Sequence, residues 1–279
     1  MGVRIVTDSA CDVPPQYAAE LEEAGVVVVP VLFRFGREQW IDRHMPMSEF
    51  LTRMARTKPQ TSAPSPGDFA AAYRTCIDAG DLVVCIALTS KHSATYDSAI
   101  VASQQFAPGL VTVVDSLSLS IGEGALVLAA ARAARQGAGV AEVVARVKDV
   151  QQRLHLLIGL DTVEYLVRGG RASRLTGVMA GLLKIRPILT MPGGELTLCG
   201  KPRGRQLAKQ ELLRLAQSHF PAELAWVAHI GCEDEARELA SDLSRLTGYP
   251  RDELTPVETG MVLATHAGPG TLGILVVSK

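Results

Sequence analysis

The sequence is poor in aromatic residues and has no excess of charge of either sign. Only 5% of its 279 residues are Phe, Trp or Tyr, although 47% are hydrophobic, so the apolar content is mostly aliphatic. The 28 basic and 29 acidic residues leave a net charge of −1. A near-neutral chain has no long-range attraction to polyanions, so we expect no nucleic acid among its partners. The aliphatic composition fits a large core or a core that surrounds an aliphatic ligand.

Cysteine pairs and long apolar runs are also missing. No CxxC pair occurs among the five cysteines, which are Cys11, Cys76, Cys85, Cys199 and Cys232. We therefore expect free thiols rather than a disulfide framework or a zinc site. No apolar run approaches the roughly 18 residues of a membrane span, and the first residues turn polar too early for a signal peptide. These features predict a cytoplasmic protein with no metal.

Common enzyme signatures are absent or lack their structural context. Residues 268–273 match GxGxxG, but an apparent strand follows where a dinucleotide site needs a helix. Residues 194–201 resemble a phosphate loop with one glycine misplaced and Pro202 in place of Ser or Thr. No HExxH, GxSxG or SxxK string occurs. Asp8 and Asp12 loosely resemble a phosphotransferase loop, and helix capping is the simpler interpretation.

The pattern of apolar runs predicts two domains of mixed α and β structure. In the first half, β-branched runs alternate with helical patterns, which indicates a parallel sheet covered by helices. The expected strands are 3–7, 26–33, 82–88 and 110–114, and the expected helices are 68–77, 93–106 and 121–136. The second half contains an expected hairpin and fewer helices, which is typical of antiparallel α+β structure. Its expected elements are strands 154–160, 188–191, 195–199, 224–230 and 274–277, helical segments to about 183, and helix 204–219. We predict an α/β domain over 1–153 and an α+β domain over 154–279.

Hydroxyl-rich loops follow several of the predicted strands. Ligands of open α/β sheets bind beyond the carboxyl ends of the strands, where 7–9, 89–90 and 115–116 supply hydroxyls and carboxylates. Before the helix at 68, Ser65 or Asp68 can act as the cap, which leaves Thr61 and Ser62 unexplained. Ser93 opens another helix, either as a plain N-cap or as part of an anion seat.

One histidine and two arginine clusters complete the candidate residues. His266 lies in an expected turn between apolar segments, where a solitary histidine is more often structural than functional. Arginines stand beside glycines at positions 168–174 and 203–205. Such clusters suit close contact with an anion or a partner protein, and solvated surface charge is the alternative.

Seven segments, spread in order over nearly the whole chain, resemble the DegV family. They are IVTDSACDVP, TSAPSPGDF, TSKHSATYDSA, VVDSLSLSIGEGALVLAAA, LDTVEYLVRGGRAS, IRPILTMPGGELTLCGKPRGR and THAGPGTLG. The resemblance implies an N-terminal α/β domain, a C-terminal α+β domain, and a fatty acid buried between and within them. Characterised members, called FakB, are the binding subunits of a bacterial fatty acid kinase. There the partner FakA supplies the ATP site, and the acyl phosphate product serves phospholipid synthesis.

The resemblance also implies roles for individual residues. Thr61, Ser62 and Ser93 would hold the fatty-acid carboxylate, with His266 nearby. Arg171 and Arg203 would serve phosphoryl transfer or kinase docking, with Arg205 as a weaker candidate. Ala94 and His92 depart from the Gly and Leu that are common in the family, which bears on the geometry of the head group.

This resemblance predicts a carrier that is not catalytic alone. Its ligand would be a long-chain fatty acid, its partner a FakA-type kinase, with transient membrane contact left open and no cofactor or metal. About fourteen buried methylenes would contribute on the order of 11 kcal/mol to binding. A stand-alone hydrolase using Ser93 and His266, or a lipid-responsive regulatory module, are the alternatives.

Overall fold

The computed structural model describes residues 2–172 and 185–279, which form two compact units. One unit comprises Met1–Leu32 and Ser62–Gln152, and the other comprises Phe33–Thr61 and Arg153–Lys279. The chain therefore passes from one unit to the other three times, after residues 32, 61 and 152. The division into domains 1–153 and 154–279 stays a prediction. The compact units change at residue 153 as well, and they also group 33–61 with the later segment.

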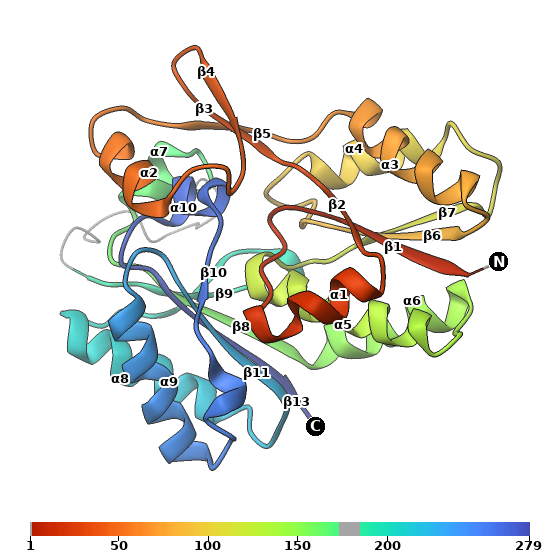
Figure 1. Ribbon diagram of the computed structural model, residues 1–279. Coiled ribbons are helices and arrows are strands. Elements are labelled where there is room, and N and C mark those ends of the chain that lie inside the picture. The colour runs from red at the N-terminus through yellow and green to blue at the C-terminus, as the bar shows by residue number, and fades with distance from the viewer. Residues whose placement is uncertain (1, 173–184) are drawn as a thin grey trace. The chain divides into compact units, whose positions relative to one another are not determined.

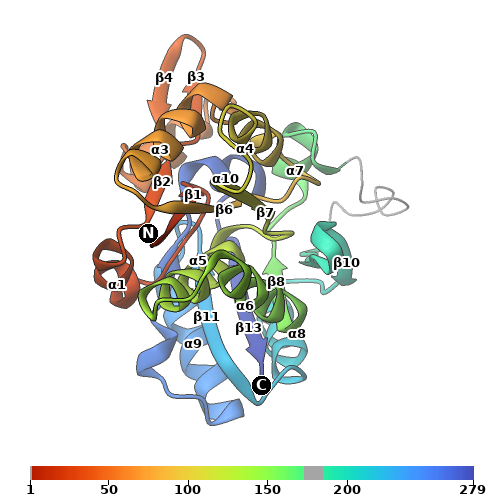
Figure 2. The ribbon, with the colours of Figure 1, turned by 90° about the vertical axis from the view of Figure 1, so that its right-hand side faces the viewer.

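The first unit is built on a four-stranded parallel sheet, as the sequence predicted. Its strands, in spatial order, are β2 (Val27–Val29), β1 (Val3–Asp8), β6 (Leu82–Ala87) and β7 (Val111–Asp115). Helices α3 (Pro66–Asp78) and α4 (Thr95–Ser103) cover one face, as Figures 1 and 2 show. The other face carries α1 (Ala18–Glu23), α5 (Ser120–Arg135) and α6 (Val140–Arg153). In β6 the residues Val83–Ala87 have no exposed surface, as expected for a central strand covered on both faces.

Local capping decides where α3 begins. Ser65 is the N-cap, because its Oγ accepts a hydrogen bond from Asp68 N at 3.2 Å. Asp68 returns the contact, since its Oδ2 accepts from Ser65 N at 2.8 Å. This capping box, together with Pro66 at the first helical position, explains a start two residues earlier than predicted.

The capping interpretation of Asp8 and Asp12 was wrong. The 3-10 turn η1 (Pro15–Tyr17) begins without a side-chain cap. Asp8 instead accepts hydrogen bonds from the backbone amides of Ala10 and Leu88, at 3.0 and 2.8 Å. Asp12 accepts a hydrogen bond from the Ser120 hydroxyl. Both aspartates therefore tie loops together at the carboxyl end of β1.

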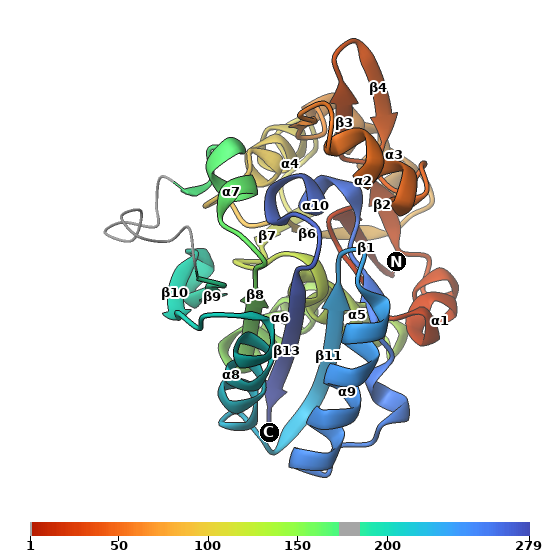
Figure 3. The same cartoon turned by 90° about the vertical axis from the view of Figure 1, so that its left-hand side faces the viewer.

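The second unit contains a six-stranded, mainly antiparallel sheet. Its order is β10 (Thr197–Gly200), β9 (Ile188–Thr190), β8 (Leu154–Gly159), β13 (Leu272–Ser278), β11 (Ala222–His229) and β12 (Val257–Glu258). Only β11 and β12 pair in parallel, so the predicted antiparallel character is confirmed. Helices α8 (Arg205–Gln217) and α9 (Glu233–Thr247) lie on one face, as Figure 3 shows. Short helical elements are α7 (Glu164–Arg168), α10 (Met261–Ala267), η4 (Pro192–Gly194) and η5 (Asp252–Leu254), and the predicted helical residues 173–183 lie outside the described residues.

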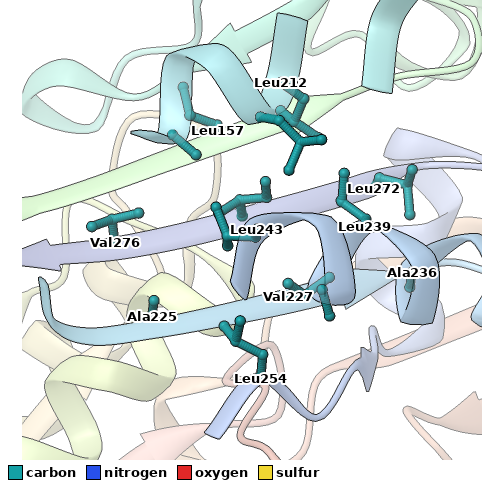
Figure 4. Close-up of a cluster of buried hydrophobic side chains, with 14 of the residues drawn as sticks. Leu157, Leu212, Ala225, Val227, Ala236, Leu239, Leu243, Leu254, Leu272 and Val276 are labelled. Atoms are coloured by element: carbon teal, nitrogen blue, oxygen red, sulfur yellow. The ribbon is translucent and has the colours of Figure 1, made fainter. Parts of the chain in front are cut away.

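An aliphatic core joins that sheet to α8 and α9 (Figure 4). Helix α9 contributes a stripe at helical spacing that is fully buried, consisting of Ala236, Leu239, Ala240 and Leu243. The facing strands supply Leu157, Val227, Leu272 and Val276. This helix was missed in the sequence analysis.

Residues 33–61 form a small sheet and one helix of their own. Strands β3 (Leu32–Phe35), β4 (Glu38–Ile41) and β5 (Gln60–Ser62) pair in the order β4-β3-β5, and α2 spans Met47–Met54. The predicted single strand 26–33 was wrong, because it is divided into β2 and β3. Pro30, which has no amide hydrogen to donate to a sheet, stands between them.

All five cysteines are free, as predicted, although only Cys76 and Cys85 are fully buried. Among the described residues, no group of His, Cys, Asp or Glu side chains has the arrangement of a metal site. In the same part of the chain, no helix is long and apolar enough to cross a membrane.

Candidate functional site

Thr61 and His266, 205 residues apart in the sequence, are in direct contact. Thr61 Oγ1, on β5, lies 3.0 Å from His266 Nε2. His266 occupies the last turn of α10, so its expected position in a turn was wrong. Both residues belong to the second unit.

The two ends of α10 are held by contacts that fix the position of His266. At its start, the buried Asp42 carboxylate accepts a hydrogen bond from Val262 N at 3.2 Å, which also places a negative charge at the helix N-terminus. A Cβ atom on Gly260 would lie 2.7 Å from Asp42 Oδ2, so a side chain at position 260 would push this carboxylate away from the helix. At the other end, Thr271 Oγ1 donates to the carbonyls of Ala267 and Gly268, at 3.0 and 2.9 Å. The sequence analysis missed Asp42 because its partner lies 220 residues away.

His266 is neutral at physiological pH. Burial lowers its pKa to about 4, and the positive charges of Arg171 and Lys58 act in the same direction. Its Nδ1 is buried and has no hydrogen-bond partner within the described part of the chain. Because buried N–H groups without a partner are rarer than buried acceptors without one, we assign the single ring proton to Nε2. Nε2–H then donates to Thr61 Oγ1, which leaves the Thr61 hydroxyl hydrogen available for an external acceptor.

Arg171 adds a positive charge to this cluster. It follows α7, and its Nη1 donates to the carbonyl of Gly169 at 2.7 Å. Burial lowers the pKa of Arg171, yet a guanidinium keeps its charge at neutral pH. A hydroxyl donor with a guanidinium in the same cluster suits an anionic group such as a carboxylate.

Arg203 and Arg205 differ in their surroundings. Arg205 donates to both oxygens of Glu235, at 2.7 and 3.1 Å, and to the carbonyl of Gly270 at 2.5 Å. It also lies 3.6 Å from Asp161 Oδ1. Arg203 is exposed, and no hydrogen bond or ion pair joins it to another described residue. Internal contacts therefore occupy Arg205, whereas Arg203 is accessible to a partner, and docking roles for both stay predictions.

Ser62 and Ser93 belong to the first unit. Ser62 is exposed and follows Thr61 in β5. Ser93 Oγ accepts a hydrogen bond from Thr95 N at 3.2 Å and lies 2.8 Å from Thr95 Oγ1. The N-cap of α4 is Ala94, so Ser93 precedes the cap position while it serves the first helical amide. Its role in holding a carboxylate, like that of Ser62, stays a prediction.

The first unit also contains a buried acidic pair that the sequence analysis missed. Glu123 on α5 has no exposed surface, and its Oε1 accepts a hydrogen bond from Thr7 Oγ1 at 3.2 Å. Burial, followed by the nearby charge of Asp8, raises the pKa of Glu123 well above its usual range. Glu123 therefore keeps its proton to a higher pH than an exposed glutamate does. The available signal was a single acidic residue within the otherwise apolar and small residues 120–131.

A parallel α/β unit joined to a mixed six-stranded sheet places the chain among two-unit α/β proteins. The sequence profile of the DegV family, described as uncharacterised proteins, matches residues 2–279. The chain belongs to the DegV family.

Related sequences and solved structures match along the whole chain. A DegV domain-containing protein from Deinococcus radiodurans is 33% identical, with 98% of each chain covered. A structure described as showing fatty acid binding of a DegV family protein from Thermus thermophilus matches with a TM-score of 0.90, 31% identity and 100% of each chain covered. A stearic acid-binding protein from Eubacterium ventriosum matches with a TM-score of 0.88 and 26% identity, with 99% of this chain and 98% of that chain covered.

Proposed function

We propose that this chain binds one long-chain fatty acid and presents its carboxylate to a separate ATP-dependent kinase in the cytoplasm. The observation that carries this proposal is the Thr61–His266 pair, which leaves a hydroxyl donor available in a chain similar to fatty-acid-binding proteins over its full length. Ser62 and Ser93 are proposed as further hydroxyl donors.

The chemistry of the pair suits a carboxylate that is withdrawn from water. A buried carboxylate must be hydrogen-bonded, because an unpaired buried charge is very costly. Hydroxyl donors meet this need without adding a formal charge, and Arg171 supplies positive charge in the same cluster. The fatty acid remains poorly reactive in this arrangement until a phosphoryl donor is placed in line with it.

Extraction and mass spectrometry of small molecules from the gently purified protein test the ligand. The expected result is one long-chain fatty acid per chain. Protein that is empty, and that also fails to bind added stearic acid in a fluorescence displacement assay, would contradict the proposal.

The kinase role requires a partner, and the exposed Arg203 is its proposed contact. Protein loaded with stearic acid should form no acyl phosphate with ATP alone, and should form it when a captured ATP-binding partner is added. Arg203→Ala should lose this transfer while still binding stearic acid. Arg245→Ala is the matched control, because Arg245 is 72% exposed and pairs only with Asp242 among the described residues. Acyl phosphate formation with ATP alone, or capture only of partners without ATPase activity, would contradict the proposal, and the second result would favour a regulatory module.

The hydrolase alternative is not favoured by the surroundings of His266. A Ser-His-Asp site needs a third group that orients the imidazole, and His266 Nδ1 has no hydrogen-bond partner in the described residues. An imidazole whose pKa is about 4 is also a weak general base at pH 7.

A further inference from the structure

Gly169, at the end of α7, lies directly against the ring of His266. A Cβ atom at position 169 would be 2.3 Å from His266 Nδ1 and 3.1 Å from Cε1. Neither contact can be relieved by a flexible side-chain end, because the atoms belong to a ring that is held at Nε2 by Thr61. Any side chain at position 169 would therefore displace the imidazole.

The backbone does not require glycine at this position. Gly169 has φ −76° and ψ −9°, which any residue adopts. The next residue, Gly170, has φ +73°, and no atom lies within 4 Å of its would-be Cβ. Of two adjacent glycines, Gly170 thus provides the left-handed conformation that ends a helix, and Gly169 provides space for His266.

A second glycine contact also joins α7 and the end of α10. A Cβ atom on Gly268, directly after α10, would lie 2.1 Å from Tyr165 Cδ2 on α7. Each segment therefore offers a glycine to an aromatic ring of the other, Gly169 to His266 and Gly268 to Tyr165. Gly169 lies against the Nδ1 edge of His266, in agreement with the lack of a hydrogen-bond partner for that atom among the described residues.

We propose that Gly169 is a positioning residue for the fatty-acid carboxylate, and that it acts through His266. Because Gly169 has no side chain, the end of α7 covers Nδ1 and holds Nε2–H against Thr61 Oγ1, so that the Thr61 hydroxyl is oriented as a donor. The assignment of the acceptor as a carboxylate rests on the proposed function. The seating of His266 does not.

Titration of His266 by NMR in fatty-acid-free protein tests directly whether Gly169 positions the imidazole ring. In Gly169→Ala the displaced ring should meet water, so its pKa should rise from about 4 toward the usual value of about 6.5. The charged groups that face His266, Arg171 and Lys58, are unchanged by the substitution. Gly170→Asn is the matched control, because asparagine tolerates a positive φ and the position is open, and it should leave the titration of His266 unchanged. A Gly169→Ala protein in which His266 titrates as in the wild type would overturn the proposal.

Binding of stearic acid tests the consequence. Gly169→Ala should weaken binding about tenfold or more, as expected for a lost hydrogen bond to a charged group. In a Thr61→Val background the same substitution should cause no further weakening, because both changes remove one interaction. An equal loss in both backgrounds would mean a general structural effect and would overturn the proposal. If the wild type binds no stearic acid, the proposed function fails, while the NMR titration still decides the role of Gly169.

A folding rescue covers the case in which Gly169→Ala does not fold. Adding His266→Asn should restore folding, because the smaller amide removes the ring that the new methyl group would meet. A double variant that still does not fold would show that Gly169 is needed for another reason, and would overturn the proposal.

Discussion

At the scale of single residues, the Thr61 hydroxyl is the main proposed hydrogen-bond donor to the fatty-acid carboxylate. Thr61→Val keeps the shape of the side chain and removes the donor. We therefore expect the free energy of stearic acid binding to become less favourable by about 1.5 to 3 kcal/mol. Thr61→Ser keeps the hydroxyl and should bind nearly as the wild type does. Calorimetric titration measures both, and an unchanged affinity in Thr61→Val would remove Thr61 from the site.

His266 should make stability depend on pH in one direction. Its pKa is about 4 in the folded chain and about 6.5 when unfolded, so only the unfolded chain takes up the proton between these values. The contribution of His266 to the free energy of unfolding is therefore fully present above pH 6.5. It falls as the pH drops toward 4, by up to about 3 kcal/mol. Urea unfolding at several pH values should show this loss in the wild type. In His266→Gln the loss should be smaller, and identical pH profiles for the two proteins would contradict the prediction.

Glu123 should give stability the opposite dependence on pH, so that its contribution decreases as the pH rises. Because its pKa is raised in the folded chain, the unfolded chain loses this proton first as the pH rises above about 4.5, and stability decreases from there until the folded pKa is passed. Glu123→Gln keeps an acceptor for Thr7 and cannot ionise, so it should be more stable than the wild type at pH 8. The difference should disappear at pH 4. A variant that is less stable at pH 8 would show that the carboxyl group itself is required.

At the scale of elements, α9 tests the core of the second unit. Leu239 has no exposed surface, whereas Leu246 on the same helix is 41% exposed. Leu239→Ala should lower the free energy of unfolding by about 2 to 5 kcal/mol, because it leaves a cavity beneath the sheet. Leu246→Ala should change it by less than about 0.5 kcal/mol. Denaturant unfolding compares the two, and similar losses would contradict the assignment of the buried face.

Elements with strong periodicity could be predicted from the sequence, and those set by distant contacts could not. Strand β6 was predicted because burial on both faces requires a continuous apolar run, and β1 because Val3, Ile5 and Val6 are β-branched. Strands β4 and β5 have four and three residues with mostly exposed side chains, so they have no such pattern. The first turn of helix α10 donates the Val262 amide to Asp42, 220 residues away, a contact that no local signal indicates.

The candidate site was predictable only in part for the same reason. The resemblance to the DegV family named Thr61 and His266, and the structure brings them together. It did not name Asp42, Glu123 or Gly169, whose importance depends on what packs against them. Two adjacent glycines look alike in a sequence, and only the φ angles and the ring of His266 separate their purposes.

At the scale of the whole molecule, removal of the ligand should lower thermal stability. A ligand present at about 100 times its dissociation constant stabilises the folded state by about 2.7 kcal/mol. For a chain of this size that corresponds to a rise in Tm of several degrees. Delipidated protein should recover this rise when stearic acid is added, as differential scanning calorimetry would show. Thr61→Val should need a higher concentration for the same shift, and a Tm that does not respond to stearic acid in the wild type would contradict the prediction.

The alternation of the chain between its two units also matters while the protein is being made. The ribosome releases residues 33–61 long before 153–279, to which they belong. During that interval the nascent chain carries β3, β4, β5 and α2 without the sheet of their unit, and Asp42 has no Val262 to bind. The second unit can close only after translation has reached α10 and β13. Folding of this protein therefore cannot simply follow the order of synthesis.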